Sequence, residues 1–167
     1  MVSTNVNLAT PSHFELNFPK IPTVTNITST NELTLNIFSS VIPGLSLDQN
    51  EIRWMAAKVS YPTGITFEPW NVSFYVDSQF KNWVIMHNWL THINNNKDTF
   101  ITKLHDYVVD ASLGVMDNFN NITLKIFFKN IWPQNLSEVV LSHKESEMYL
   151  ESTITFYYDR FEIAEID

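Results

Sequence analysis

Apolar and polar residues alternate along much of this chain, and a period of two predicts strands that bury one face. Clear alternation covers residues 13–18, 33–37, 70–76, 122–129 and 148–158. Shorter or weaker strand patterns cover residues 58–61, 103–109 and 139–142. Together these runs predict a mainly β fold, a β-sandwich or partly open barrel with one flanking α-helix.

The period changes to that of an amphipathic helix at about residues 78–93. Asp77 and Ser78 are good N-cap residues, and three consecutive Asn at 94–96 are predicted to end the helix. The predicted buried stripe consists of Phe80, Trp83, Val84, His87 and Leu90. Because His87 and His92 do not share a helix face, we expect His87 to pack half-buried rather than to bind a metal.

Residues 45–67 follow no single period, and we expect a long connection between strands there. Apolar residues stand beside charged ones in this segment, which favours a surface that contacts a partner. Trp54 is expected to be exposed, because aromatic side chains on long loops often make contacts. Around this segment we expect a flexible N-terminal arm at residues 1–12 and one domain at residues 13–167.

The net charge of −8 argues against simple nucleic-acid binding, since no cluster of Lys and Arg is present. The chain has no Cys, which excludes disulfides and thiol catalysis. No apolar run approaches the length of a membrane span, and the first residues lack the pattern of a secretory signal. The 18 Asn residues supply turn formers that tolerate positive φ angles.

Motifs that would indicate catalysis are missing from the sequence, including phosphate-binding, dinucleotide-binding, zinc-protease and serine-hydrolase patterns. Glu145, Glu147 and Glu151 cluster near the start of the last predicted strand, and Glu145 and Glu147 flank a predicted turn, where solvated carboxylates are usual. We therefore predict no enzyme, no cofactor and no metal site. The five Trp leave a β-sandwich carbohydrate-binding module as a rival, although Trp70 and Trp83 lie on apolar stripes, which favours core packing.

Long strands in a small sheet leave edges whose unpaired N–H and C=O groups invite pairing with another chain. Closing one barrel from several subunits would remove those edges. Ring assembly is therefore a reasonable expectation, although the strand pattern does not set the number of subunits.

Three segments resemble the tail tube proteins of T4-type contractile bacteriophages. They are Val41-Ile42-Pro43-Gly44-Leu45, Thr66-Phe67-Glu68-Pro69-Trp70-Asn71-Val72-Ser73-Phe74, and Lys129-Asn130-Ile131-Trp132-Pro133-Gln134-Asn135-Leu136-Ser137-Glu138-Val139 with the following Ser146-Glu147-Met148. In that family a Trp-Pro motif with a following Asn stands ahead of the final strand, as it does here. The order and spacing agree over about residues 13–163, whereas the Asn-rich segment after the helix and the Pro-rich first strand depart from the family pattern.

The resemblance implies a subunit of hexameric rings, with strands pooled into an inner barrel and rings stacked into a tube that conducts DNA. The implied partners are further copies of the chain, a sheath protein, and baseplate and tail-terminator proteins. The implied location is the virion tail, after assembly in the host bacterial cytoplasm. A baseplate tube-initiator ring, or the tube of a type VI or tailocin-like injection machine, remains as an alternative.

The resemblance also implies contacts between subunits or rings from the long segment at 45–67, the arm at 2–12 and the tail at 160–167. The individual contact residues that we expect are Leu45, Leu47, Ile52, Arg53, Trp54, Met55, Phe161 and Ile163. Residues that face the channel are expected at polar strand positions, namely Thr123, Glu151, Thr153 and Thr155. An acidic channel wall would repel DNA and let it slide.

Overall fold

The computed structural model of the chain describes residues 13–18, 36–96, 107–143 and 149–165. Within these ranges the chain forms nine strands and one helix. The elements are β1 (Phe14–Asn17), β2 (Ile37–Ser40), β3 (Leu45–Trp54), β4 (Ala57–Phe67), β5 (Trp70–Tyr75), α1 (Lys81–Asn96), β6 (Val109–Met116), β7 (Ile122–Leu136), β8 (Glu151–Tyr157) and β9 (Arg160–Glu165). The predicted arm at 1–12 and the predicted strand segments at 33–35 and 103–106 lie outside the described residues.

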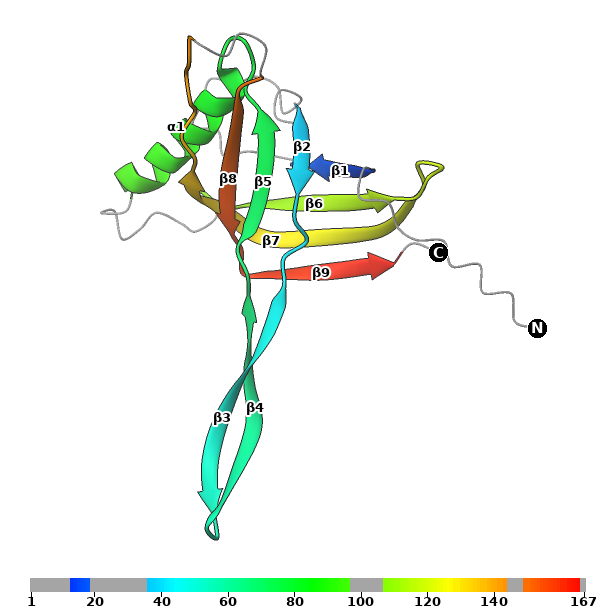
Figure 1. Cartoon of the computed structure of the whole chain (residues 1–167), viewed down its shortest axis with the longest axis vertical. Coiled ribbons are helices and arrows are strands. Elements are labelled where there is room, and N and C mark those ends of the chain that lie inside the picture. Colours follow the sequence, from blue (N-terminus) through cyan, green and yellow to red (C-terminus); the bar gives the residue numbers. More distant parts are fainter. Residues whose placement is uncertain (1–12, 19–35, 97–106, 144–148, 166–167) are drawn as a thin grey trace, which may run out of the picture.

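The strands form two antiparallel layers that share β7 (Figure 1). The first layer has the order β1-β6-β7-β9, and the second has the order β7-β8-β5-β2. The strands of the first layer run across those of the second, and β3 and β4 form a separate hairpin that projects away from both (Figure 1). The prediction of a mainly β fold with one helix is confirmed, and the two layers are not closed into a barrel within the subunit.

The apolar faces of the two layers meet in an aromatic core. Trp70 is fully buried and stacks on Phe128, with ring centroids 4.1 Å apart and planes 9° from parallel. Its indole N–H donates a hydrogen bond of 3.0 Å to the hydroxyl of Ser40, so the polar atom of the ring is satisfied. The predicted alternation in β5 is confirmed, because Trp70, Val72 and Phe74 are all buried.

β7 passes from one layer to the other at Asn130, whose φ of 53° lies in the left-handed region that Asn tolerates better than most residues. The alternation predicts this strand only over residues 122–129, whereas the strand continues to Leu136. A register shift between Pro133 and Asn135 accommodates the proline, which has no N–H to give to a ladder.

The helix starts three residues later than predicted. The backbone of Phe80 is left-handed, with φ of 57°, and its N–H bonds to the carbonyl of Asp77, so a turn separates Asp77 from the helix. The buried Asn82 joins strand and helix, because its side chain accepts from the N–H of Asp77 and donates to the carbonyl of Tyr75. Asp77 and Ser78 are therefore not the N-cap. The predicted stop at 94–96 is also wrong, because these residues form the last turn of α1.

The buried face of α1 differs from the predicted stripe. Ile85, Met86 and Trp89 are buried, and the indole N–H of Trp89 donates to the carbonyl of Tyr107. His87 is exposed and stacks on the ring of Trp83, so the predicted packing of His87 is wrong. Within the described ranges, α1 lacks the length and the apolar character that a membrane-crossing helix requires.

Three further predictions about strands differ from the structure. Residues 45–67 are not an irregular connection but the two long strands of the hairpin. Within the run at 148–158 the structure has one strand, shorter than predicted: β8 covers Glu151–Tyr157 and ends at a corner at Tyr158 and Asp159, after which β9 begins. Residues 139–142 are not a strand.

Candidate assembly surfaces

The hairpin of β3 and β4 projects as an arm whose residues are almost all exposed. Its turn consists of Met55 and Ala56, with φ of 46° and 66°. Two consecutive positive φ angles define a primed hairpin turn, which normally takes Asn and Gly. This turn therefore carries backbone strain, and the exposed Met55 stands at its apex.

The cross-strand pairs of the hairpin separate apolar from polar residues, because directly opposed residues share a face. At the base, Leu45 opposes Phe67 and Leu47 opposes Ile65, so one face of the base is apolar. The other face of the base is polar, and there the hydroxyl of Thr66 donates to the carboxylate of Asp48 at 2.8 Å.

Toward the tip the two faces exchange their character. Ile52 opposes Val59 and Trp54 opposes Ala57, on the face that is polar at the base. The face that is apolar at the base now carries the opposed pair Arg53 and Lys58. On that face the ammonium of Lys58 also contacts the carboxylate of Glu51 at 3.2 Å. The exchange occurs where the register shifts, between the Leu47–Ile65 and Gln49–Pro62 pairs.

Seven of the eight predicted contact residues are exposed: Leu45, Leu47, Ile52, Arg53, Trp54, Met55 and Ile163. Phe161 differs from them, because it is only partly exposed and packs against the rings of Phe128 and Tyr158. Phe161 also meets Phe67 edge-on at 5.6 Å, so it joins the start of β9 to the base of the hairpin.

The first layer ends in two strands that have only one partner each within the described chain. β1 pairs with β6 alone, and β9 pairs with β7 alone. Direction alternates across the four strands, so β1 and β9 run antiparallel to each other from opposite edges of the same layer.

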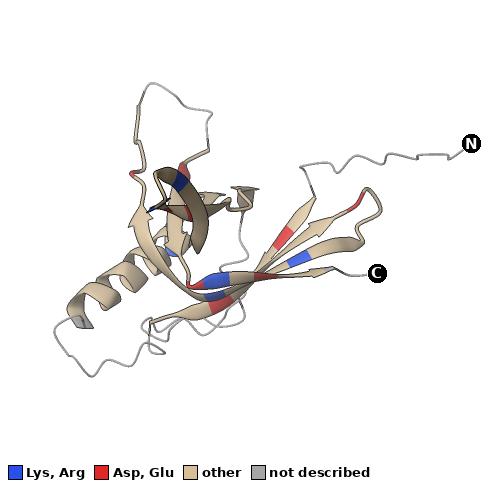
Figure 2. Cartoon of the chain, turned by 90° about the horizontal axis from the view of Figure 1, so that it is seen from below, with Lys and Arg blue, Asp and Glu red and all other residues tan. Residues whose placement is uncertain are grey.

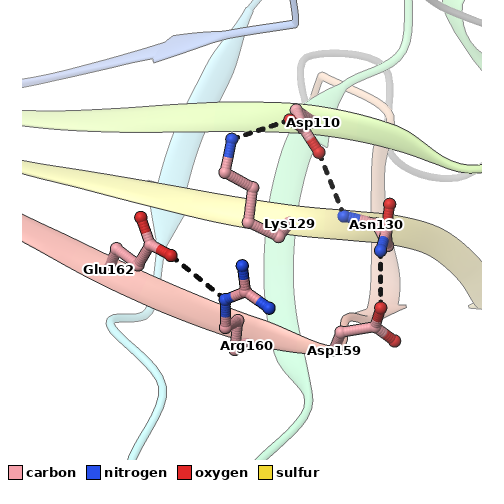
Figure 3. Close-up of polar contacts among 6 residues, drawn as sticks. All are labelled: Asp110, Lys129, Asn130, Asp159, Arg160 and Glu162. Carbon is pink, nitrogen blue, oxygen red and sulfur yellow. Dashed lines mark hydrogen bonds and ion pairs between the residues drawn. The ribbon is translucent and has the colours of Figure 1, made fainter.

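Charged residues of both signs lie along the strands of the first layer (Figure 2). Lys129 bonds to the carboxylate of Asp110 at 2.8 Å, and Arg160 bonds to Glu162 at 3.0 Å. Burial raises the pKa of Asp110, but the hydrogen bonds from Lys129 and the N–H of Asn130 outweigh it and leave that pKa below its usual value. The contacts of Lys129 and Asn130 with Asp110 tie β7 to β6, whereas the Arg160–Glu162 pair lies within β9 (Figure 3).

The same close-up shows how the corner after β8 is held. The side-chain amide of Asn130 donates to the carboxylate of Asp159 at 2.6 Å (Figure 3). The backbone N–H of Asp159 donates in turn to the carbonyl of Lys129. The corner that separates β8 from β9 is therefore fixed to the point at which β7 changes layer.

The predicted channel residues lie on two different surfaces. Thr123 is exposed on the first half of β7, on the charged layer. Glu151, Thr153 and Thr155 lie on the outer face of β8, where Thr153 bonds to Ser73 and Thr155 to Asn71 across the strand pair.

None of these four side chains is buried in the core. In the part of the chain that the structure describes, no group of three His, Cys, Asp or Glu could hold a metal ion.

The residues that sequence reasoning missed are the partners of the contact residues on the second hairpin strand, chiefly Val59 and Ile65. Both are exposed, and each opposes a predicted contact residue. The free edge of β1 is missing from the predictions as well, whereas β9 lies in the tail at 160–167, for which contacts are predicted. Only the register of the strands reveals these residues, because no motif surrounds them.

Comparisons with known proteins show similarity to proteins of phage tail tubes. The profile of a family described as "Phage tail tube protein" matches residues 9–164. The tail tube terminator protein of Enterobacteria phage T4 is 29% identical, over 94% of this chain and 89% of its own length.

Two solved structures share the fold. A chain in the sheath–tube complex of the extracellular contractile injection system PVC, in its extended state, has a TM-score of 0.66 at 13% identity, covering 97% of this chain and 95% of that one. A chain in the cap structure of the anti-feeding prophage, described as a tube terminating cap, has a TM-score of 0.66 at 14% identity, covering 99% and 100%.

Proposed function

Because this chain belongs to the phage tail tube protein family, we propose that it forms a hexameric ring in a contractile phage tail and that this ring terminates the tail tube. The chain is a structural protein of the tail and not an enzyme. The observation that carries the terminator role is the relative from phage T4, which matches nearly the whole chain and is named a tube terminator.

The free edges of the first layer support a ring. With four strands of alternating direction, β9 of one copy and β1 of the next run antiparallel when the copies are related by rotation. Pairing of these edges would continue the sheet from copy to copy and leave no edge exposed. An isologous dimer would satisfy only one edge per copy, so a closed ring removes more unpaired backbone groups.

In such a ring the outer face of the first layer, which carries Thr123, would line the channel. Glu151, Thr153 and Thr155 would then lie on the second layer, away from the channel wall. We therefore propose Thr123 as a channel residue and assign the three β8 residues to another surface of the ring. DNA would pass through the channel, with sheath, baseplate and tube proteins as neighbours.

A second candidate is the repeating subunit of the tube itself. The family description and the fold shared with a sheath–tube complex favour it. The two roles differ in one property: a repeating subunit offers both ring faces for stacking, whereas a terminator stops growth after it binds.

The test combines electron microscopy and sedimentation of the purified chain with addition of preformed tubes of the tube protein from the same phage. A terminator should form single rings that do not grow into filaments, and should bind one end of the tubes and block their elongation. Hollow filaments of this chain alone would instead establish the repeating subunit. A chain that stays monomeric at high concentration, and does not bind tubes, would overturn both roles.

A further inference from the structure

The register places charged side chains from all four strands on the outer face of the first layer, because directly opposed residues share a face. Lys125 of β7 lies between Gly114 of β6 and Ala164 of β9, and the buried residues of these strands point to the opposite face. The charged residues whose described side chains share the outer face are Glu15, Asp110, Lys125, Lys129, Arg160 and Glu162.

The charges on this outer face cancel, since three of them are carboxylates and three are cations. The chain as a whole carries a net charge of −8, so its acidic excess lies elsewhere. A ring lined by this face would therefore have a channel wall of balanced charge, in place of the acidic wall that the sequence favours.

The three cations of the outer face differ in their partners. Lys129 and Arg160 each contact a carboxylate of the same face, at 2.8 and 3.0 Å. Lys125 forms no ion pair within the described part of the chain, and its ammonium lies over the ring of Phe127, 5.2 Å from the ring centroid. Because an aromatic ring has no net charge, Lys125 remains able to bind an anion.

The strands beside Lys125 leave its side chain accessible. On one side the directly opposed residue is Gly114, which has no side chain, and on the other it is Ala164, which adds one methyl group. Glu15 stands in the same row but beyond Gly114, so its backbone lies two strand spacings, or roughly 10 Å, from that of Lys125. An anion that approaches the outer face would reach the ammonium without displacing a neighbouring side chain.

We propose, on the basis of the ring proposed above, that Lys125 contacts the phosphate groups of a DNA duplex in the channel. Rotation about the ring axis would place six copies of Lys125 at one level, as a belt of six cations. Six four-stranded layers with strands roughly 4.8 Å apart enclose a channel about 37 Å across between backbones, before strand tilt widens it, and such a channel admits one duplex.

The belt of Lys125 residues would meet phosphates at any position along the duplex, since B-DNA carries one negative charge per roughly 1.7 Å of its axis. The rest of the wall, with its paired charges, would neither repel the duplex nor hold it over a long stretch. The contact is therefore independent of DNA sequence and confined to one level of the channel.

The test measures binding of a short, fluorescein-labelled linear duplex to rings of the chain, by fluorescence anisotropy over a series of salt concentrations. Lys125→Gln removes the charge, whereas Lys125→Arg keeps it. Lys81→Gln is the matched control, because Lys81 is exposed at the start of α1 and its loss changes the net charge by the same amount. A relaxed circular duplex, added as unlabelled competitor, cannot enter a closed channel and reports binding to other surfaces. Electron microscopy checks that each variant forms rings.

Wild-type rings should bind the linear duplex with an affinity that falls with salt, and the circular duplex should compete poorly. Lys125→Gln should weaken binding about ten-fold and lower the salt slope by about one or more, whereas Lys125→Arg and Lys81→Gln should keep wild-type values.

Three results would overturn the contact at Lys125 while leaving the ring intact: no binding of the linear duplex, equal competition by the circular duplex, or equal losses from Lys125→Gln and Lys81→Gln. A Lys125→Arg variant as weak as Lys125→Gln would assign the loss to packing on Phe127 and would overturn it as well. A wild-type chain that forms no rings would overturn the ring function itself, which microscopy shows without DNA.

Discussion

The hydroxyl of Tyr158 donates a hydrogen bond of 2.8 Å to the backbone carbonyl of Glu68. This bond ties the corner between β8 and β9 to the segment that follows the hairpin. Phe67, next to Glu68, packs edge-on against the ring of Tyr158 as well. The arm is therefore anchored in the core at its base, although its own residues lie in solvent.

Tyr158 should make stability depend on pH in the alkaline range. Burial, together with the nearby Glu68, raises the pKa of Tyr158 to about 12 from 10.0. Since the folded-state pKa is the higher one, the contribution of the neutral phenol is complete below pH 10 and is lost as the pH rises toward 12. Tyr158→Phe should lower the free energy of unfolding at pH 8 by about 1 kcal/mol and flatten its decline above pH 10. Urea unfolding from pH 8 to 12 measures both, and an unchanged slope in the variant would contradict the assignment.

Trp70→Ala should destabilise the subunit strongly, because the buried ring stacks on Phe128 and bonds to Ser40. A cost of about 3–5 kcal/mol is expected for removing a buried Trp. Trp54→Ala is the matched control, since Trp54 is 66% exposed and should change the unfolding free energy by less than about 0.5 kcal/mol. Equal effects of the two substitutions in denaturant unfolding would mean that the core is placed wrongly.

Asn130→Gly and Asn130→Ala should separate backbone strain from the side-chain bond to Asp159. Both variants lose that bond, but only Ala must adopt the left-handed backbone with a Cβ, at a cost of about 1–2 kcal/mol. We expect the stability order Asn, then Gly, then Ala in thermal unfolding. A Gly variant no more stable than the Ala variant would show that strain at this corner is small.

The double substitution Met55→Asn with Ala56→Gly should relieve the strained turn of the arm, because these residues suit two positive φ angles. Amide hydrogen exchange in the isolated subunit should slow for β3 and β4 by several-fold, while the two layers keep their rates. Unchanged exchange in the arm would indicate that the turn does not limit its opening.

Replacing Trp54 and Met55 together with Ser should leave the subunit folded and impair assembly, because both side chains are exposed at the tip of the arm. Circular dichroism and sedimentation of the same sample give the two readouts. A subunit that unfolds would instead place this pair in the core of the protein.

Much of the fold follows from the alternation of apolar and polar residues in strands that bury one face. β5 and the first half of β7 keep a strict period against the core, and the sequence predicts both with their buried residues. The sequence predicts an irregular connection in place of the arm for two physical reasons. Its apolar residues change face near Asp48, so no single period runs through it, and its turn uses Met55 and Ala56 where a hairpin normally shows Asn and Gly.

For the helix, the sequence pattern allows two different buried faces. Two stripes of α1 carry large apolar side chains, and periodicity alone does not decide between them. The polar Asn82 decides, because its bonds to the end of β5 orient the first turn and bring Ile85, Met86 and Trp89 onto the core. The contact residues on β3 could be named from the sequence, whereas their partners on β4 required the register.

The shared strand β7 also has a mechanical consequence. The first part of its 15 residues pairs in the first layer and the last part pairs in the second, so the polypeptide backbone itself crosses from one layer to the other. The layers therefore cannot separate by losing side-chain packing alone, since β7 would first have to peel away from β6, β8 or β9. A load applied along the edges of the first layer is carried by a covalent link into the second, where it meets the ladder of hydrogen bonds between β5 and β8.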